Sequence, residues 1–434
     1  MKRRLLSVLF IVLLLLAAGC KKDEKKKKTA AVKVLSGRMT ALPDYSLPEN
    51  ATADEMRKTA IKAMRDGLSV QWYPENDFQY MKAGTSSKKV YKFSADKIYC
   101  GLPYTNGDSS ILHWLQYYDL STGKLDKSIL DGQFYKSFGN ACATAVMWGW
   151  NAVCPDMKWD SCSNMTPQNG CIPVEGFKYP YEITTYSQFP TKTICNENGE
   201  QTMYKSYTNL LPADAVMTYS YIDNEQFNHV MMVTDKPHVE YNPDGSIDGE
   251  KSFVLVQDQR AGHTQEKYPY LKTENGEKHQ YSGRIDYPVT FAELFKSHNI
   301  PLTCAQFLGK TPYVKATASL DGDAPADYNS LSSMTVRSNY NIVSVSMTVT
   351  DKKAKKQVSY KKYVRINNWW NKTKDKDADK EYALTYVLNN QKDGISTLSE
   401  VSGNLVSGNV YTVKIDVLVA TGQTLTAFNG DVTG

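Results

Sequence analysis

The chain has 434 residues, 41% of them hydrophobic and 22% charged, with a formal net charge of +5. This length predicts two or three domains with sizeable cores. Residues 1–28 carry nine basic side chains against two acidic ones, so the rest of the chain has a net charge of −2. The positive charge therefore belongs to the N-terminus, and we expect no nucleic-acid partner.

The N-terminus predicts export and a lipid anchor. Residues 1–19 form a signal peptide, in which Lys-Arg-Arg precedes an apolar run over 5–16 that is too short to span a bilayer. The sequence Ala-Ala-Gly before Cys20 resembles a bacterial lipobox, which implies cleavage before Cys20 and a lipid on its thiol. An ordinary signal peptide cleaved nearby is the alternative.

A tether follows over residues 20–52, and its first eight residues after Cys20 are lysines around two acidic side chains. A block of like charge this dense does not fold on itself. It resembles the export signals of surface lipoproteins in the Bacteroidota. We therefore expect the protein in the cell envelope of a Gram-negative bacterium, at the outer membrane or cell surface, with the Cys20 lipid as its membrane contact.

Two helices are predicted in the first half of the folded chain. Thr52 and Glu55 form a capping-box pattern that begins a helix over 53–68, ended by Gly67. Its buried face would hold Met56, Ala60, Ala63 and Met64. After β-like segments such as 89–96, a turn-rich loop is expected over 99–119. The second helix, 142–153, begins at Cys142 within the stretch GNACATAVMWGW.

Eight cysteines are present, and seven remain once Cys20 is assigned to the lipid. An oxidising compartment favours disulfides, and an odd number leaves one thiol unpaired. Cysteines 154, 162, 171 and 195 share a loop-like stretch and predict a stapled loop, whereas Cys100 and Cys304 are far enough apart in sequence to close the domain. The pairing stays open. A zinc site is the rival hypothesis for these cysteines. Because the sequence has no Cys-x-x-Cys pair, we expect no metal site.

Strands dominate from residue 210 onwards. Segments 210–222, 228–237 and 248–259 are predicted strands, and 290–300 is a predicted helix. A cysteine-bearing helix followed by antiparallel strands indicates an α+β domain, which we place at 53–318. A linker over 319–330 then leads to short alternating segments over 331–434, which predict an Ig-like β-sandwich, with a small barrel as the alternative.

Cys142 and His229 are the candidate nucleophile and base. A helix N-terminus and a nearby imidazole both lower the pKa of a thiol, and the N–H of Cys142 is a natural oxyanion donor. His229 begins the strand His-Val-Met-Met-Val, where its ring can face a helix. A third polar group should orient the imidazole; Asp258 is preferred because a carboxylate stabilises an imidazolium, with Gln257 and Gln259 on the opposite face as alternatives.

Four segments resemble the NlpC-type papain-like cysteine peptidases, which cleave peptide bonds in bacterial cell-wall peptidoglycan. They are GLPYTNGD (101–108), NACATAVMW (140–148), LLPADAVMTY (210–219) and NHVMMVTD (228–235). The resemblance implies a papain-like catalytic domain with Cys142 as nucleophile, His229 as base, Asp258 or a neighbour as orienting residue, and Tyr104 in the substrate pocket. The chain departs from the family in having Ala-Cys-Ala instead of Asp-Cys-Ser, Ala213 in place of glycine, and a longer segment between Cys142 and His229.

The leading hypothesis is a lipid-anchored hydrolase that cleaves peptide or amide bonds, with peptidoglycan stem peptides as substrate and no cofactor. Transglutaminase-like acyl transfer uses the same residues and would release ammonia. A surface lipoprotein with a degenerate papain-like core and an Ig-like binding domain is the non-enzymatic alternative. In that case the Ig-like domain could bind a polysaccharide through Trp369 and Trp370. A half-buried structural pair explains these two tryptophans equally well. The oligomeric state is open.

Overall fold

A computed structural model describes most of the chain after residue 32. The described ranges are 33–81, 90–95, 97–105, 107–126, 139–155, 157, 161–222, 225–264, 280–365, 383–388 and 405–434. The predicted signal peptide, Cys20 and the Trp369–Trp370 pair lie outside the described residues. Within those ranges, every helix is too short or too polar to cross a bilayer.

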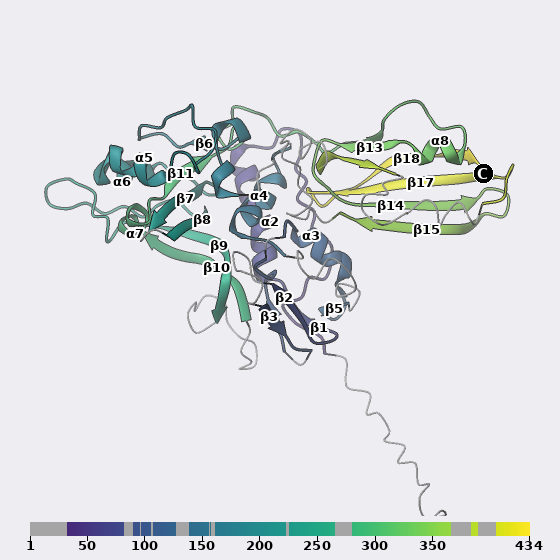
Figure 1. The fold of residues 1–434 in the computed structure, drawn as a ribbon, viewed down its shortest axis with the longest axis horizontal. Helices are drawn as coiled ribbons and strands as arrows, with labels where there is room; N and C mark the ends of the chain where they lie inside the picture. Colours follow the sequence, from purple (N-terminus) through teal and green to yellow (C-terminus); the bar gives the residue numbers. More distant parts are fainter. Residues whose placement is uncertain are drawn as a thin grey trace, which may run out of the picture. The chain divides into compact units, whose positions relative to one another are not determined.

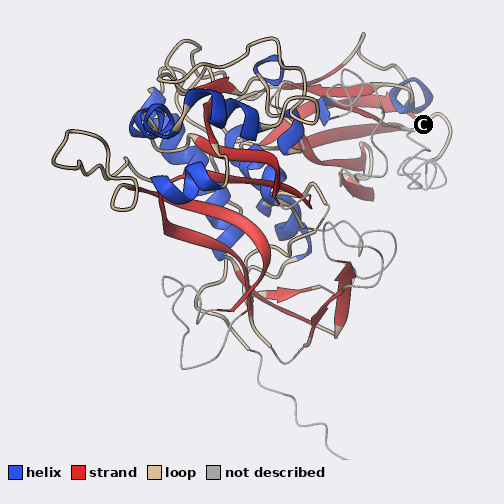
Figure 2. Cartoon of the chain, turned by 60° about the vertical axis from the view of Figure 1, so that its left-hand side comes forward, coloured by secondary structure: helices blue, strands red, loops and turns tan. Residues whose placement is uncertain are grey.

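Residues up to about 310 form an α+β arrangement (Figures 1 and 2). Its helices are α2 (Ala53–Ser69), α3 (Ile111–Trp114), α4 (Cys142–Asn151), α5 (Thr191–Asn198), α6 (Glu200–Thr208) and α7 (Phe291–Lys296), and its short 3-10 turns are η1 (Leu115–Tyr117), η4 (Cys162–Asn164) and η5 (Pro167–Asn169). The helices α2 and α4 pack against each other and against the sheet.

The sheet is mixed, and among the described residues its order is β5-β1-β4-β10-β9-β8-β7-β11-β6. Its strands are β1 (Gln71–Pro74), β4 (Tyr99–Cys100), β5 (Lys124–Leu125), β6 (Ile172–Pro173), β7 (Ala215–Ile222), β8 (Glu225–Val233), β9 (Phe253–Thr264), β10 (Gln280–Thr290) and β11 (Ile300–Thr303). A separate hairpin joins β2 (Phe78–Met81) and β3 (Val90–Phe93). The neighbours β7, β8, β9 and β10 are antiparallel, so residues far apart in sequence meet across them.

Helix α2 begins as its sequence predicts. The Glu55 carboxylate accepts from Thr52 N at 2.8 Å, and the Thr52 hydroxyl accepts from Glu55 N at 3.3 Å, which completes the capping box. The expected inner face is buried, with Met56, Ala60, Ala63 and Met64 among its residues. The helix continues through Gly67 to Ser69, so the predicted end was two residues early.

Several elements were not predicted from the sequence. The segment 99–119, expected to be a loop, contains α3 and η1, and the stretch after the cysteine-rich region contains α5 and α6. Strand β10 was also missed. Its sequence breaks the strand pattern with Gly283 and Pro288, and its pairing with β9 contains register shifts. The extended conformation of β10 therefore depends on its pairing with β9, and not on an alternation of apolar and polar residues in its own sequence.

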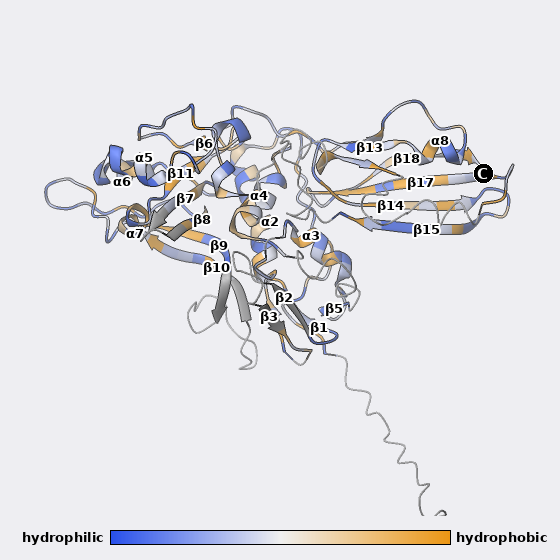
Figure 3. Ribbon diagram, viewed as in Figure 1, coloured by the Kyte–Doolittle hydropathy of each residue, from blue (hydrophilic) through white to orange (hydrophobic). Residues whose placement is uncertain are grey.

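The C-terminal residues form a β-sandwich. One sheet has the order β12-β13-β16 and the other β15-β14-β17-β18. The strands are β12 (Ala318–Leu320), β13 (Thr335–Ser338), β14 (Ile342–Asp351), β15 (Lys356–Val364), β16 (Thr385–Val387), β17 (Val410–Val419) and β18 (Thr424–Thr433), with α8 (Tyr328–Ser332) between β12 and β13. Along most of β14 and β17 alternate residues are buried, and Figure 3 colours the residues of both strands by their hydropathy. The predicted linker over 319–330 contains part of β12 and part of α8.

The contact between α2, α4 and β8 depends on Gly149. A Cβ atom there would lie 2.8 Å from Met232 Cε and 3.0 Å from the Ala60 carbonyl oxygen. We expect Gly149→Ala to lower the free energy of unfolding by about 1–3 kcal/mol, since overpacking shifts neighbouring backbone. Gly67→Ala in α2 is the matched control. Its nearest atom would be 3.7 Å away, so it should be neutral or gain up to about 1 kcal/mol in denaturant unfolding. Equal losses in both variants would contradict this account.

Candidate active site

Gly139 allows the loop at 101–108 to approach the start of α4. Its φ is +129°, and a Cβ atom would lie 2.3 Å from the Pro103 carbonyl oxygen. The contact is completed by Asn140 N donating to Pro103 O at 3.2 Å and by Thr105 N donating to Asn140 O at 3.0 Å. This pairing places the Tyr104 hydroxyl 3.8 Å from the Cys142 sulfur.

Cys142 is the first residue of α4, as the sequence predicts. Ala141 is the N-cap, with extended backbone, and its N–H donates to the Thr144 hydroxyl at 2.9 Å. Thr144 Oγ1 also lies 3.3 Å from Gly107 O and thereby ties the first turn to the loop. The N–H groups of a first helical turn have no carbonyl four residues earlier to bind, so they can serve an anion.

His229 lies on β8 and Asp258 on the neighbouring strand β9. The His229 Nε2 and Asp258 Oδ2 atoms are 2.6 Å apart. The carboxylate is fully buried, and the imidazole is 12% exposed. Cys142 and the same imidazole are close enough for each to shift the pKa of the other. With Nε2 bonded to Asp258, Nδ1 is the ring nitrogen left for the thiol. The structure thus brings together Cys142, His229, Asp258 and Tyr104.

Gln257 and Gln259 point elsewhere. Gln257 Nε2 donates to Ile61 O of α2 at 3.0 Å, and Gln259 Nε2 donates to Leu102 O at 2.6 Å. Both amides are fully buried, and they hold helix α2 and the loop after β4 against the sheet. Of the three candidates for the orienting group, Asp258 is the one hydrogen-bonded to His229.

Arg284 on β10 also belongs to the site, although the sequence analysis did not single it out. It lies opposite Asp258 in the β9–β10 register. Its Nε donates to Oδ1 at 2.9 Å and its Nη2 to Oδ2 at 2.7 Å, a two-pronged ion pair. Its guanidinium stacks 4.3 Å from the centre of the Tyr287 ring. The only sequence signal for Arg284 would be a basic residue in a strand that faces a carboxylate on its neighbour. Using that signal requires the register of the two strands to be known.

The charges of the site favour an ion pair between Cys142 and His229. The contact with Cys162 lowers the pKa of Cys142, burial raises it, and His229 and Tyr104 lower it, leaving it well below the ordinary value. Burial alone would lower the pKa of His229, but Asp258 and Cys142 outweigh it and raise the pKa to about 9. Burial would raise the pKa of Asp258, but His229 and Arg284 hold it far below the usual range.

Removing the Arg284 guanidinium should destabilise the fold strongly. We expect Arg284→Met to lower the free energy of unfolding by about 3–5 kcal/mol, because it leaves a buried carboxylate with His229 and the more distant Arg260, 3.9 Å away, as its charged partners. Denaturant unfolding at neutral pH measures this loss. Arg337→Met, which breaks a surface ion pair with Asp321, is the control and should cost under about 1 kcal/mol. A loss of that small size at Arg284 would mean that Asp258 is held by other groups.

The remaining described cysteines do not form the predicted loop staples. Cys154 Sγ lies 3.5 Å from Cys304 Sγ without a bond between them, so the neighbour of Cys304 is Cys154 and not Cys100. Cys100 instead has its sulfur 3.2 Å from Ser69 O. All cysteines in the described residues are buried free thiols. Across the same residues, no three histidine, cysteine or acidic side chains are arranged to hold a metal ion.

His113 illustrates a structural histidine close to the site. It is buried on α3, accepts from Ser110 N at 3.0 Å through Nδ1, and its ring meets the edge of Trp148 at 5.1 Å. Trp148 in turn donates to Asp108 Oδ1 at 2.9 Å. These contacts fix α4 against α3 and the loop before it.

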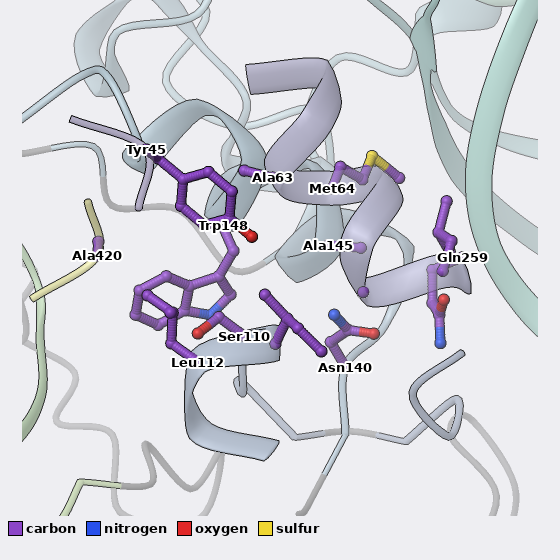
Figure 4. A pocket seen from close by; sticks show the side chains of 13 residues that line it. Tyr45, Ala63, Met64, Ser110, Leu112, Asn140, Ala145, Trp148, Gln259 and Ala420 are labelled. Atoms are coloured by element: carbon purple, nitrogen blue, oxygen red, sulfur yellow. The ribbon is translucent and has the colours of Figure 1, made fainter. Parts of the chain in front are cut away.

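A small cavity lies beside α4 (Figure 4). It is lined by residues of α2, α3, α4 and the segments around Tyr45, Asn140, Gln259 and Ala420. Its volume of about 20 Å³ suits one water molecule and no substrate. The lining does not include Cys142, His229 or Asp258. The cavity is therefore a packing feature behind the candidate site.

Comparison with known proteins adds no assignment. No family model matches the chain, and no curated protein matches it.

Proposed function

We propose that this protein is a cysteine hydrolase of papain-like, NlpC type, which cleaves peptide or amide bonds through a thioester. The observation that carries the proposal is one chain of contacts. A thiol at a helix N-terminus meets an imidazole whose other nitrogen is 2.6 Å from a buried carboxylate. Nucleophile, base and orienting group in this order are the components of covalent acyl transfer.

In the first half of the reaction, the Cys142 thiolate attacks the carbonyl carbon of the scissile bond. The N–H of Cys142 at the start of α4 donates to the oxygen that becomes negative. The His229 imidazolium then gives its proton to the leaving amine, and the C–N bond breaks. Asp258 stabilises the imidazolium before this step, and Arg284 keeps the carboxylate ionised and aligned.

In the second half, the neutral His229 takes a proton from water, and the resulting hydroxide attacks the thioester carbon. The same helix N-terminus stabilises the second oxyanion. The C–S bond breaks, the carboxylic product leaves, and the thiolate–imidazolium pair is restored. His229 regains from water the proton that it gave to the leaving amine, so this cycle uses only water as co-reactant.

Peptidoglycan stem peptides are the substrate class we propose, on the resemblance of residues 101–108, 140–148, 210–219 and 228–235 to the NlpC type. Ala213, which replaces the glycine of that pattern, has a φ of +71°, a conformation that glycine adopts without strain. Ala213 therefore has the backbone conformation that glycine would favour, although the residue itself differs from the family pattern. A lipid on Cys20 would hold such an enzyme next to the cell wall.

The test is alkylation of the purified mature protein by iodoacetamide between pH 5 and 9, with peptide mass spectrometry on each cysteine. Cys142 should already be modified rapidly at pH values well below the ordinary thiol pKa of about 8.5. Burial raises the pKa of Cys100 and Cys195 to about 12, so these two thiols should stay largely unmodified until the protein unfolds.

If Cys142 resists alkylation until unfolding, the hydrolase proposal fails. The protein would then be better explained as a surface lipoprotein with an inactive core. If Cys142 reacts and an amine is incorporated into an acyl donor with release of ammonia, acyl transfer replaces hydrolysis as the reaction.

A further inference from the structure

Two buried thiols meet near the end of α4 that is far from Cys142, and the hydrolytic mechanism uses neither of them. Cys154 follows the last residues of α4, and Cys304 comes directly after the last residue of β11. Their sulfur atoms are 3.5 Å apart, although the two residues are 150 positions apart in the sequence. Both side chains are fully buried.

The backbone on each side of this thiol pair is held by hydrogen bonds. Cys154 N donates to Trp150 O at 2.8 Å, and Cys154 O accepts from Asn151 Nδ2 at 3.1 Å. Cys304 O accepts from Leu308 N at 3.3 Å, and the strand before it, β11, is paired with β6 on one edge and β7 on the other. The fold therefore brings the two thiols together and keeps them there.

This contact suits a covalent bond between the sulfurs. A disulfide holds its two sulfur atoms about 2.05 Å apart, so this pair has to approach by about 1.5 Å. Rotation of the two side chains about their Cα–Cβ bonds moves the sulfurs without moving the backbone. The signal peptide predicted at residues 1–19 would take the chain to an oxidising compartment, where disulfides form and persist.

We propose that Cys154 and Cys304 form a structural disulfide as the protein folds, with another disulfide compound as the oxidant. One cysteine thiolate attacks a sulfur of the oxidant, the oxidant's S–S bond breaks, and one small thiolate leaves. The second cysteine then attacks the protein sulfur of this mixed disulfide and displaces the other small thiolate. Two protein thiols lose two electrons and two protons, and the oxidant gains them as two thiols.

The burial of the pair indicates when the bond forms. Burial and the neighbouring Cys304 raise the pKa of Cys154 well above its ordinary value, and the thiolate is the form that attacks a disulfide. A fully buried, protonated thiol is also out of reach of an oxidant in solution. The bond therefore forms while the segments assemble, and the reduced, folded protein should be oxidised slowly.

The bond would tie α4 to the sheet. Helix α4 begins with Cys142, and β11 pairs with β7, which in turn pairs with the strand that carries His229. Closing a loop of 150 residues also removes conformational freedom from the unfolded chain, which stabilises the folded state. This stabilisation is independent of the proposed hydrolysis.

Cys171 is the rival partner for Cys304. The register of β6 and β11 places Ile172 opposite Thr303, so Cys171 and Cys304 are the next residues along these two strands. Cys171 is also fully buried. Among the described cysteines, however, the thiol in hydrogen-bonding contact with Cys304 is that of Cys154. The structure therefore favours the bond to Cys154, and the test has to distinguish the two.

The experiment refolds the reduced, denatured mature protein in a mixture of reduced and oxidised glutathione. Free thiols are then blocked with iodoacetamide in denaturant, and unreduced peptides are mapped by mass spectrometry. We expect a cross-linked peptide pair containing Cys154 and Cys304, and at least about tenfold less labelling of both cysteines than after refolding in dithiothreitol. Cys171→Ala is the control for the rival partner and should give the same cross-link.

Denaturant unfolding provides the second measurement. Reduction of the refolded protein should raise the equilibrium constant for unfolding by about 30-fold or more. The double variant Cys154→Ala with Cys304→Ala should lack this response to the reductant.

A cross-link between Cys171 and Cys304 would overturn the proposal, as would full labelling of Cys154 and Cys304 after refolding with oxidised glutathione. A response to the reductant of equal size in the double variant would also contradict it. Should the double variant fail to fold, the peptide map of the unaltered chain decides alone.

Discussion

Cys142→Ser should abolish hydrolysis of peptidoglycan stem peptides by the mature protein. Loss of the nucleophile in enzymes of this logic costs about 10⁴-fold or more in turnover, because a serine hydroxyl is not ionised by an imidazole in the way that a thiol is. The substitution is nearly isosteric, so the fold and the contacts of the helix start should persist. Release of free amino groups from purified muropeptides, followed by mass spectrometry, measures the loss.

Cys195→Ser is the matched control for this variant. Cys195 is also fully buried, but its sulfur lies 3.7 Å from Asn299 O on the α5 side of the sheet, and it has no part in the proposed chemistry. It should retain most of the activity of the unaltered chain. If Cys142→Ser remained as active as Cys195→Ser, hydrolysis would have to come from another group and the assignment of the nucleophile would be wrong.

His229→Gln should remove the reactivity of Cys142 at low pH. In the unaltered protein the thiolate–imidazolium pair persists between the low pKa of Cys142 and the pKa of His229 of about 9. Without the imidazole, the thiol loses its cationic partner and its pKa rises, although Cys162 and Tyr104 still lower it. Below the pKa, each unit of that rise lowers the thiolate fraction about tenfold. Iodoacetamide labelling of Cys142 at pH 6 should therefore fall by about tenfold or more and recover as the pH rises.

The sign of the pH dependence separates the two roles of His229. As the pH falls through the pKa of Cys142, the thiolate is protonated, and both alkylation and hydrolysis should decline. As the pH rises through about 9, His229 loses the proton that the leaving amine needs. Hydrolysis should then decline while alkylation continues. A pH profile for alkylation of His229→Gln that matches the unaltered protein would show that groups other than His229 lower the pKa of Cys142.

Much of the local structure was predictable from the sequence because the signals are short-range. The Thr52–Glu55 capping box begins α2, and Cys142 begins α4, as expected. The strands β7, β8 and β9 and the alternating strands of the sandwich were also anticipated, since turn residues and apolar periodicity are local properties. These local signals were sufficient to predict an α+β domain followed by a β-sandwich. The papain-like assignment and the signal peptide, by contrast, remain proposals from resemblance.

The partners within the site were decided by the tertiary structure. Residues 256–259 of β9 are all buried, so polarity does not reveal which of Gln257, Asp258 and Gln259 faces the histidine. The register with β8 and β10 settles it, because a shift of one residue exchanges the two faces of a strand. Asp258 consequently meets His229 and Arg284, whereas the glutamines bind backbone carbonyls.

The same reason applies to the cysteines. Their spacing predicted pairs within one loop, but α4 carries Cys142 at its start, Cys154 follows just after its end, and different segments cover the two ends. Cys162 is close enough to Cys142 for each to shift the pKa of the other, and Cys304, directly after β11, lies 3.5 Å from Cys154 between the sulfur atoms. The sequence by itself determined which residue types were available and where several of the helices and strands begin. Only the packing of those elements decided which side chains meet, because contacts across a sheet or at a helix end join residues that no local pattern relates.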